Sequence, residues 1–144
     1  MSTVELTGGC LCGAVRYRAR TGSAHASVCH CRMCQRWNGA PFFTAFSVSA
    51  DEIEWQGTPP VEWRSSDIAV RSHCGTCGTP LYWKGDRQPT CFDISLMTLD
   101  DPSVLTPVDQ IWSTVAAHWP GVLPDLPAWP GDDREGEPFA RGSD

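Results

Sequence analysis

Hydrophobic and polar residues alternate along much of the chain, which is the pattern of β-strands. Between residues 14 and 20, Val15, Tyr17 and Ala19 alternate with arginines. A period of two places successive side chains on opposite faces, so a half-buried strand is predicted here. Further strands are expected over residues 42–48, 53–56, 61–64, 68–72, 80–84 and 92–97. One helix of a turn or two is predicted over residues 32–37.

Turn-forming residues separate these segments. They are Gly-Gly at residues 8–9, Asn-Gly at 38–39, Gly-Thr-Pro-Pro at 57–60 and Lys-Gly-Asp at 84–86. Short strands at regular spacing between such turns favour an all-β sandwich or barrel-like domain with little helix.

One domain is expected, over residues 1–130, because independent cores usually run about 100–150 residues and the chain has 144. Residues 119–129 carry several prolines among Leu and Trp, and we expect an extended arm packed over the sheet. Residues 131–144 are polar, acidic and Gly-rich, which predicts a flexible tail with little to bury.

Composition and charge exclude several classes of protein. The chain is 41% hydrophobic and 19% charged, which is enough apolar material for a folded core. A net charge of −6 argues against a general nucleic-acid binder, whose affinity comes from Lys and Arg on phosphates. The sequence has no apolar run long enough to predict a membrane span and no basic, apolar start typical of a secretory signal. We therefore expect a cytoplasmic protein.

Cysteine is over-represented, with eight residues in the chain. Seven of them lie in close sets, at Cys10 and Cys12, at Cys29, Cys31 and Cys34, and at Cys74 and Cys77. Disulfides belong to oxidising compartments, and a bridge within such a set would close a small, strained ring. Converging thiolates suit tetrahedral zinc, so metal binding is favoured over a disulfide framework.

Two of the sets offer two ligands each. On an extended chain, Cys10 and Cys12 would point to the same face and reach one ion. Cys74 and Cys77, followed by Gly78, have the spacing of a zinc knuckle, in which glycine permits a tight turn. A closed structural site needs four ligands, so the simplest arrangement joins the two pairs around one zinc. A thioredoxin-like redox pair at Cys74 and Cys77 is disfavoured, because a strand-like segment follows and not a helix.

The third set points to a different kind of site. Cys29, Cys31 and Cys34 supply three thiolates within six residues, with no obvious fourth cysteine nearby. Three protein ligands and one open position are typical of catalytic zinc, where the fourth ligand is water or a substrate thiol. Such an open site on a short loop is expected to hold its ion more weakly and to be partly empty.

Other residues near these sets have simpler interpretations. His30 is expected to point away from its cysteine neighbours, and Cys91 to be a small buried hydrophobe, although either could complete the second site. Arg32, Arg36 and Arg71 could attract the carboxylates of a substrate. Each arginine taken singly is expected to be a solvated surface charge.

The cysteine sets and their surroundings resemble the glutathione-dependent formaldehyde-activating enzyme family. The matching segments are residues 8–17 (GGCLCGAVRY), 29–36 (CHCRMCQR), 71–81 (RSHCGTCGTPL) and 99–102 (LDDP). The resemblance implies a β-tent of short antiparallel sheets with two zinc sites. It assigns a structural zinc to Cys10, Cys12, Cys74 and Cys77 and a catalytic zinc to Cys29, Cys31 and Cys34.

The family's founding activity is a carbon–sulfur lyase reaction, the condensation of glutathione with formaldehyde to S-hydroxymethylglutathione. The resemblance therefore predicts an enzyme acting on a small thiol adduct, with a thiol such as glutathione and a small aldehyde as its partners. The family also includes centromere protein V, so a non-catalytic, zinc-stabilised binding or scaffold module is the alternative. A closed fourth ligand at the second zinc would favour the scaffold, whereas an open position beside a pocket would favour the enzyme.

Overall fold

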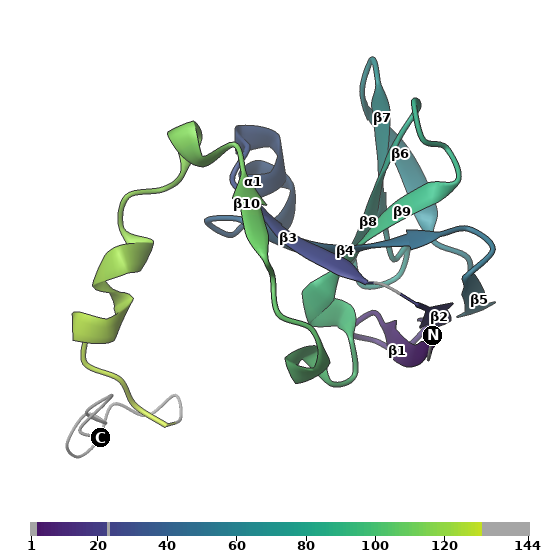
Figure 1. Ribbon diagram of the computed structural model, residues 1–144, viewed down its shortest axis with the longest axis horizontal. Coiled ribbons are helices and arrows are strands. Elements are labelled where there is room, and N and C mark those ends of the chain that lie inside the picture. Colours follow the sequence, from purple (N-terminus) through teal and green to yellow (C-terminus); the bar gives the residue numbers. More distant parts are fainter. Residues whose placement is uncertain (1–2, 23, 131–144) are drawn as a thin grey trace.

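Strands dominate the computed structural model, which describes residues 3–22 and 24–130 (Figure 1). The strands are β1 (Val4–Gly9), β2 (Val15–Thr21), β3 (His25–Cys29), β4 (Phe43–Ser49), β5 (Ile53–Gly57), β6 (Val61–Ser66), β7 (Ala69–His73), β8 (Pro80–Gly85), β9 (Cys91–Ser95) and β10 (Asp109–Ile111). The helical elements are α1 (Arg32–Asn38) and the short 3₁₀ helices η1 (Leu96–Thr98), η2 (Pro102–Val104), η3 (Ser113–Val115) and η4 (Pro120–Asp125). The mainly β fold with little helix is as predicted.

The described strands form two sheets. One has the order β1-β2-β5, and the other has the order β10-β3-β4-β9-β8-β7-β6. All neighbours are antiparallel except β10, which runs parallel to β3. The strand expected over residues 92–97 ends early, because the chain turns into η1 and the Leu99 N–H donates to the Leu96 carbonyl. Strands β1, β3 and β10 were not predicted.

The larger sheet presents two different faces. A buried row crosses it from β3 to β7, consisting of Ala26, Phe46, Ile94, Tyr82 and Ser72. Tyr82 packs on Trp55 of the smaller sheet, with ring centroids 5.4 Å apart, so the core lies between the two sheets. Because neighbouring residues of a strand point to opposite faces, the adjacent residues form a second row on the outer face. That outer row lines the cavity described below.

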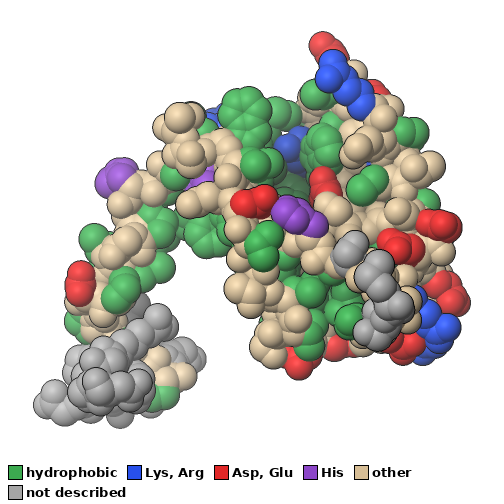
Figure 2. All heavy atoms as spheres, viewed as in Figure 1, with side chains coloured by type: hydrophobic (Ala, Val, Ile, Leu, Met, Phe, Trp, Pro, Cys, Tyr) green, Lys and Arg blue, Asp and Glu red, His purple; other side chains and the backbone are tan. Residues whose placement is uncertain are grey.

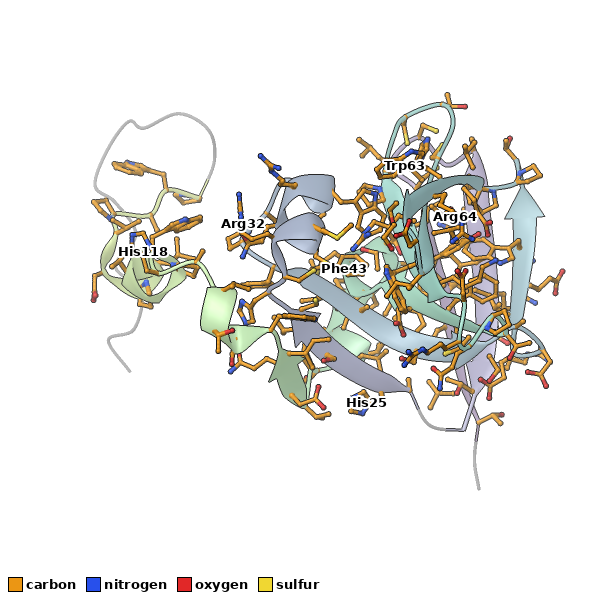
Figure 3. The ribbon with its side chains drawn as sticks, turned by 90° about the horizontal axis from the view of Figure 1, so that it is seen from above. His25, Arg32, Phe43, Trp63, Arg64 and His118 are labelled. Atoms are coloured by element: carbon orange, nitrogen blue, oxygen red, sulfur yellow. The ribbon has the colours of Figure 1, made fainter. Side chains whose placement is uncertain are left out.

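The C-terminal arm differs from its prediction. It was expected to pack over the sheet, but Trp119, Val122, Leu123 and Leu126 are 45–50% exposed. Figure 1 shows η4 standing away from both sheets, and Figure 3 shows the segment that carries His118 well apart from the strands that carry Phe43 and Trp63. The hydrogen bonds of the Val122 and Leu126 N–H groups are internal to the arm, so the segment folds as its own short helix. The tail predicted over residues 131–144 lies outside the described residues.

Within the described part of the chain, no helix is both long and apolar enough to cross a membrane.

Candidate metal centres and active site

Four cysteines from two distant segments meet beside the core. Cys10 and Cys12 follow β1, Cys74 and Cys77 follow β7, and their four Sγ atoms lie within 4.8 Å of one another. The Cys10–Cys12 and Cys12–Cys74 sulfurs are 3.6 and 3.8 Å apart, and all four are free thiols. A tetrahedral zinc with Zn–S bonds of about 2.3 Å sets its sulfurs about 3.8 Å apart. The donor set and its spacing therefore fit zinc.

Both cysteine loops reverse direction at a glycine. Gly13 has φ 81° and donates its N–H to the Cys10 carbonyl at 3.1 Å, while Gly78 has φ 80° and donates to the Cys74 carbonyl at 2.9 Å. Residues with a Cβ rarely adopt this left-handed conformation. The expectation that Cys10 and Cys12 lie on an extended chain is wrong, since they lie in a turn, and the turn itself brings their sulfurs together.

Hydrogen bonds to sulfur favour the thiolate form of Cys10 and Cys77, whereas burial and the neighbouring thiols raise the pKa of Cys12 to about 11. The Val15 N–H donates to Cys10 Sγ at 3.2 Å. Thr79 Oγ1 lies 3.1 Å from Cys77 Sγ, and the side-chain and backbone hydrogen bonds of Thr79 lower the pKa of Cys77 to about 5. A thiolate is the form of cysteine that binds a metal ion, so the hydrogen bonds to Cys10 and Cys77 favour metal binding at this cluster.

The second cysteine set converges where β3 meets α1. Cys29 ends β3, Cys31 caps α1, and Cys34 lies in its first turn, with the three Sγ atoms within 4.8 Å of one another. The Cys34 N–H donates to Cys31 Sγ at 3.3 Å. Over residues 3–22 and 24–130, no further His, Cys, Asp or Glu donor atom joins this set. Three soft ligands fit zinc with one coordination position left over.

Two of these thiols, Cys29 and Cys34, differ in how easily they ionise. The hydrogen bond between Cys29 and Cys34 lowers the pKa of Cys29, and the same bond together with burial raises the pKa of Cys34. Cys29 is therefore the more easily ionised of the two sulfurs.

Arg71 lies directly behind this set. Its side chain is buried, with Nη2 3.6 Å from Cys34 Sγ and Nη1 donating to Ser65 Oγ at 2.6 Å. The guanidinium carbon lies 5.6 Å from the Trp37 ring centroid. The expectation of a solvated Arg71 is wrong, because β7 lies between β6 and β8 and the side chain packs against Cys34 and Trp37 of α1. Three thiolates around Zn²⁺ leave a net negative charge, which a buried guanidinium balances.

The remaining candidates lie outside the clusters. Arg32 and Arg36 are exposed, and Arg32 Nη1 donates to Gln35 Oε1. The His30 ring is packed, with Nε2 2.8 Å from Gln110 Oε1 and its edge against Phe42. Cys91 begins β9 and belongs to neither group of sulfurs.

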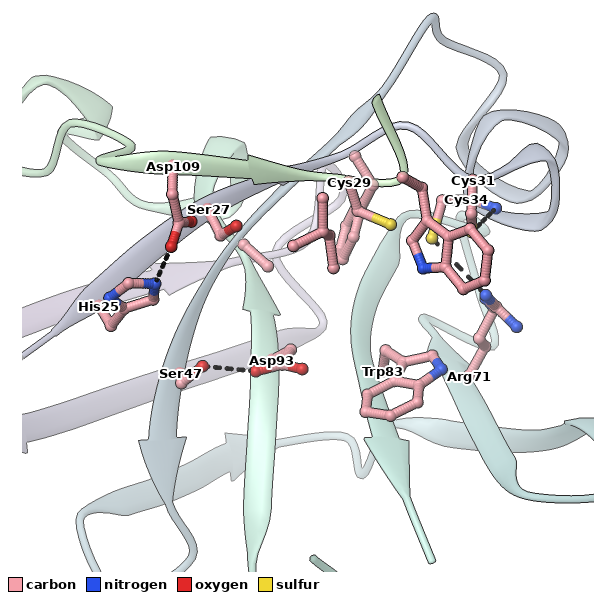
Figure 4. Close-up of a pocket in the computed structure, with 14 residues that line it drawn as sticks. His25, Ser27, Cys29, Cys31, Cys34, Ser47, Arg71, Trp83, Asp93 and Asp109 are labelled. Atoms are coloured by element: carbon pink, nitrogen blue, oxygen red, sulfur yellow. Dashed lines mark hydrogen bonds and ion pairs between the residues drawn. The ribbon is translucent and has the colours of Figure 1, made fainter. Parts of the chain in front are cut away.

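A cavity of about 400 Å³ opens beside the second cysteine set. Figure 2 shows this face of the molecule hollowed, with charged and histidine side chains around the hollow, and Figure 4 shows the residues inside. The three cysteines and Arg71 form one end of the cavity, which we call the sulfur end. Its apolar walls include Phe43, Trp83, Ile111 and Trp112.

The other end of the cavity, which we call the acidic end, is lined by His25, Ser47, Asp93 and Asp109. His25 Nε2 lies 3.1 Å from Asp109 Oδ2, and Ser47 Oγ donates to Asp93 Oδ1 at 2.6 Å. Burial raises the pKa of Asp93. Sequence reasoning missed this end, although the predicted alternation over residues 92–97 already set Asp93 on the face opposite Ile94.

A known protein family matches the part of the chain that carries both cysteine clusters. The model of the glutathione-dependent formaldehyde-activating enzyme family matches residues 5–115, which include all seven clustered cysteines. The chain belongs to this family. The resemblance in sequence implies two zinc sites, and the structure brings the cysteines together in two clusters that could hold metal.

A curated relative in Schizosaccharomyces pombe carries the name of an uncharacterized lyase. It is 35% identical over 79 residues, which cover 55% of this chain and 57% of the relative. The match thus spans little more than half of that lyase. A crystal structure of a Rhodobacter sphaeroides protein has a TM-score of 0.58 at 22% identity and covers 72% of this chain and 98% of its own. That likeness shows the fold.

Proposed function

We propose that this member of the formaldehyde-activating enzyme family is a zinc-dependent carbon–sulfur lyase that joins a small thiol to a small aldehyde. Glutathione and formaldehyde are the proposed pair. Cys29, Cys31 and Cys34 would hold the catalytic zinc, and Cys10, Cys12, Cys74 and Cys77 the structural zinc.

One observation carries the proposal, namely that the three-cysteine set faces a cavity while no fourth protein donor of the described residues closes it. When bound there, zinc would lower the pKa of a substrate thiol and polarise a carbonyl. A zinc with four protein ligands would have no place for the thiol, so the open position favours the enzyme over the scaffold.

The side chains around the cavity have separate roles in this reaction. Trp83, Trp112 and Phe43 line the cavity with aromatic rings, which offer an apolar surface to a substrate beside the cysteines. The Arg71 guanidinium stabilises negative charge at the sulfur end. The S–C bond forms as the carbonyl π bond opens, and the thiol proton ends on the oxygen of the new hydroxymethyl group.

Catalysis can be tested even though thiols and formaldehyde also combine without an enzyme. Exchange NMR with ¹³C-formaldehyde and glutathione measures how fast the free aldehyde and its adduct interconvert at equilibrium. The zinc-loaded protein is expected to accelerate this exchange in proportion to its concentration. A Cys31→Ala variant, which keeps only the structural zinc, should not accelerate the exchange.

Two results would count against the lyase. A fully loaded protein, with two zinc ions per chain, that leaves the exchange rate of glutathione and other small thiols unchanged would favour the scaffold. Acceleration that persists in full in Cys31→Ala would place the chemistry elsewhere.

A further inference from the structure

Residues of opposite charge lie on one row across the cavity face of the larger sheet. Strand pairing places His25, Ser47, Asp93, Trp83 and Arg71 opposite one another in succession, from β3 to β7. Two strand spacings separate Asp93 from Arg71, which is about 10 Å, with Trp83 between them. The row therefore joins the acidic end of the cavity to its sulfur end (Figure 4).

The sulfur end contains a buried cation, which would balance the net negative charge of a zinc ion held by three thiolates. Arg71 is 4% exposed, and its Nε is buried without a hydrogen-bond partner. Among residues 3–22 and 24–130, no carboxylate pairs with it, and its nearest ionisable neighbour is the Cys34 thiol. A buried guanidinium in this position attracts thiolates, including that of a substrate.

The acidic end presents carboxylates to the cavity. Asp93 accepts from Ser47, and within the described residues it has no Lys or Arg partner. His25 also lines this end of the cavity, and its ring is paired with Asp109. Of the two carboxylates at this end, Asp93 is the more buried, and its hydrogen bond comes from Ser47. A cation entering the cavity would be stabilised there.

We propose that the cavity selects an aminothiol, holding its thiolate at the sulfur end and its ammonium group on Asp93. This inference rests on the proposed function, because it takes the second cysteine set as the site of the thiol. The two ends of the cavity match the two charges of an aminothiolate, so a ligand bound the other way round would meet like charges at both ends.

The length of the row also limits the ligand. The ammonium must lie several bonds from the sulfur to span about two strand spacings. In free cysteine the two groups are on adjacent carbons, which is too short. A γ-glutamyl amide of cysteine carries its ammonium at the far end of a flexible chain and can reach Asp93. A thiol without an amino group would leave the Asp93 carboxylate uncompensated.

Titration calorimetry on the zinc-loaded protein tests this with two matched probes. The probes are γ-glutamylcysteine and glutarylcysteine, which differ only in that hydrogen replaces the amino group. We expect the amino probe to bind about ten- to a hundred-fold more tightly, which is the usual effect of one charged hydrogen bond. Asp93→Asn keeps an acceptor for Ser47 and should remove this preference. Asp51→Asn, at an exposed turn, is the matched control and should keep it.

The outcomes separate the two proposals. Equal binding of both probes by the wild type, or a preference that survives in a folded Asp93→Asn protein, would overturn the ammonium site and leave the lyase intact. Failure of the wild type to bind either probe would overturn the thiol site and the proposed function with it. The comparison of probes in the wild type needs no variant, so a misfolded Asp93→Asn would not spoil the test.

Discussion

Arg71 Nη2 lies 3.6 Å from Cys34 Sγ, so a buried cation is in direct contact with the open cysteine set. This contact joins β7 to α1, which are distant in the sequence. Because the same strand β7 leads into Cys74, the segment that would supply the structural zinc site also carries the cation behind the catalytic one. One strand thereby connects the two clusters.

Replacing the guanidinium should weaken metal binding at the second cluster only. For Arg71→Met we expect zinc affinity there to fall about 10- to 100-fold, the usual effect of losing a group that contacts a metal ligand. Competition with a chromophoric chelator measures this. Arg36→Met, which removes an exposed arginine of α1, is the control and should leave both affinities unchanged. Unaltered zinc affinity in Arg71→Met would contradict the charge-balancing role.

Mild chelation should remove one zinc ion before the other. The four-cysteine cluster is closed and joins two distant segments, whereas the three-cysteine cluster leaves one position to solvent. A metal count during dialysis against a weak chelator is expected to fall from two ions per chain to a stable plateau of one. Circular dichroism should stay unchanged at that plateau. Simultaneous loss of both ions would show that the sites are equally strong.

The four-cysteine cluster should be essential for folding. A structural zinc contributes on the order of 10 kcal/mol to folding in small peptide systems, which is as much as the whole stability of a typical domain. Cys77→Ser is therefore expected to give an unfolded or poorly soluble chain, judged by circular dichroism and thermal melting. Cys91→Ser, at a cysteine outside both clusters, should fold normally. A Cys77→Ser protein with an unchanged melting temperature would refute a structural zinc here.

The left-handed backbone at Gly78 should be needed for zinc binding by the loop of Cys74 and Cys77. Gly78 has φ 80°, and a Cβ added there would contact nothing, so Gly78→Ala introduces backbone strain alone. The left-handed conformation costs about 1–2 kcal/mol for a residue with a Cβ. We expect a lower melting temperature and weaker zinc binding by the first cluster. Gly22→Ala, where a Cβ also meets open space but φ lies outside the left-handed region, should be neutral.

Losing a ligand of the second cluster should separate activity from folding. Cys31→Ala removes one sulfur and the cap of α1, which costs about 1 kcal/mol. The thiol–aldehyde exchange is expected to disappear, while the thermal midpoint falls only slightly because the first cluster is untouched. Cys91→Ala should keep full activity.

Local sequence was enough to predict much of the fold. Alternation around Val15, Tyr17 and Ala19 predicts β2, and these residues are fully buried against the rest of the core. Sequence spacing also separated the cysteines into the sets that the structure brings together. Strand β10 was not predicted, because its three residues are all exposed and show no alternation of hydrophobic and polar side chains. It is a strand only through its pairing with β3, which the local sequence does not show.

By itself, the sequence determined most of the strand pattern, the grouping of the cysteines and the family, because these depend on residue type and spacing along the chain. Only the tertiary structure decided that Arg71 is buried behind Cys34 and that Asp93 shares a row with it. Register across β7, β8 and β9 sets these neighbours, and register depends on long-range pairing of strands. An arginine or aspartate in an alternating strand shows which face it occupies, but its cross-strand partners determine what charge it meets there.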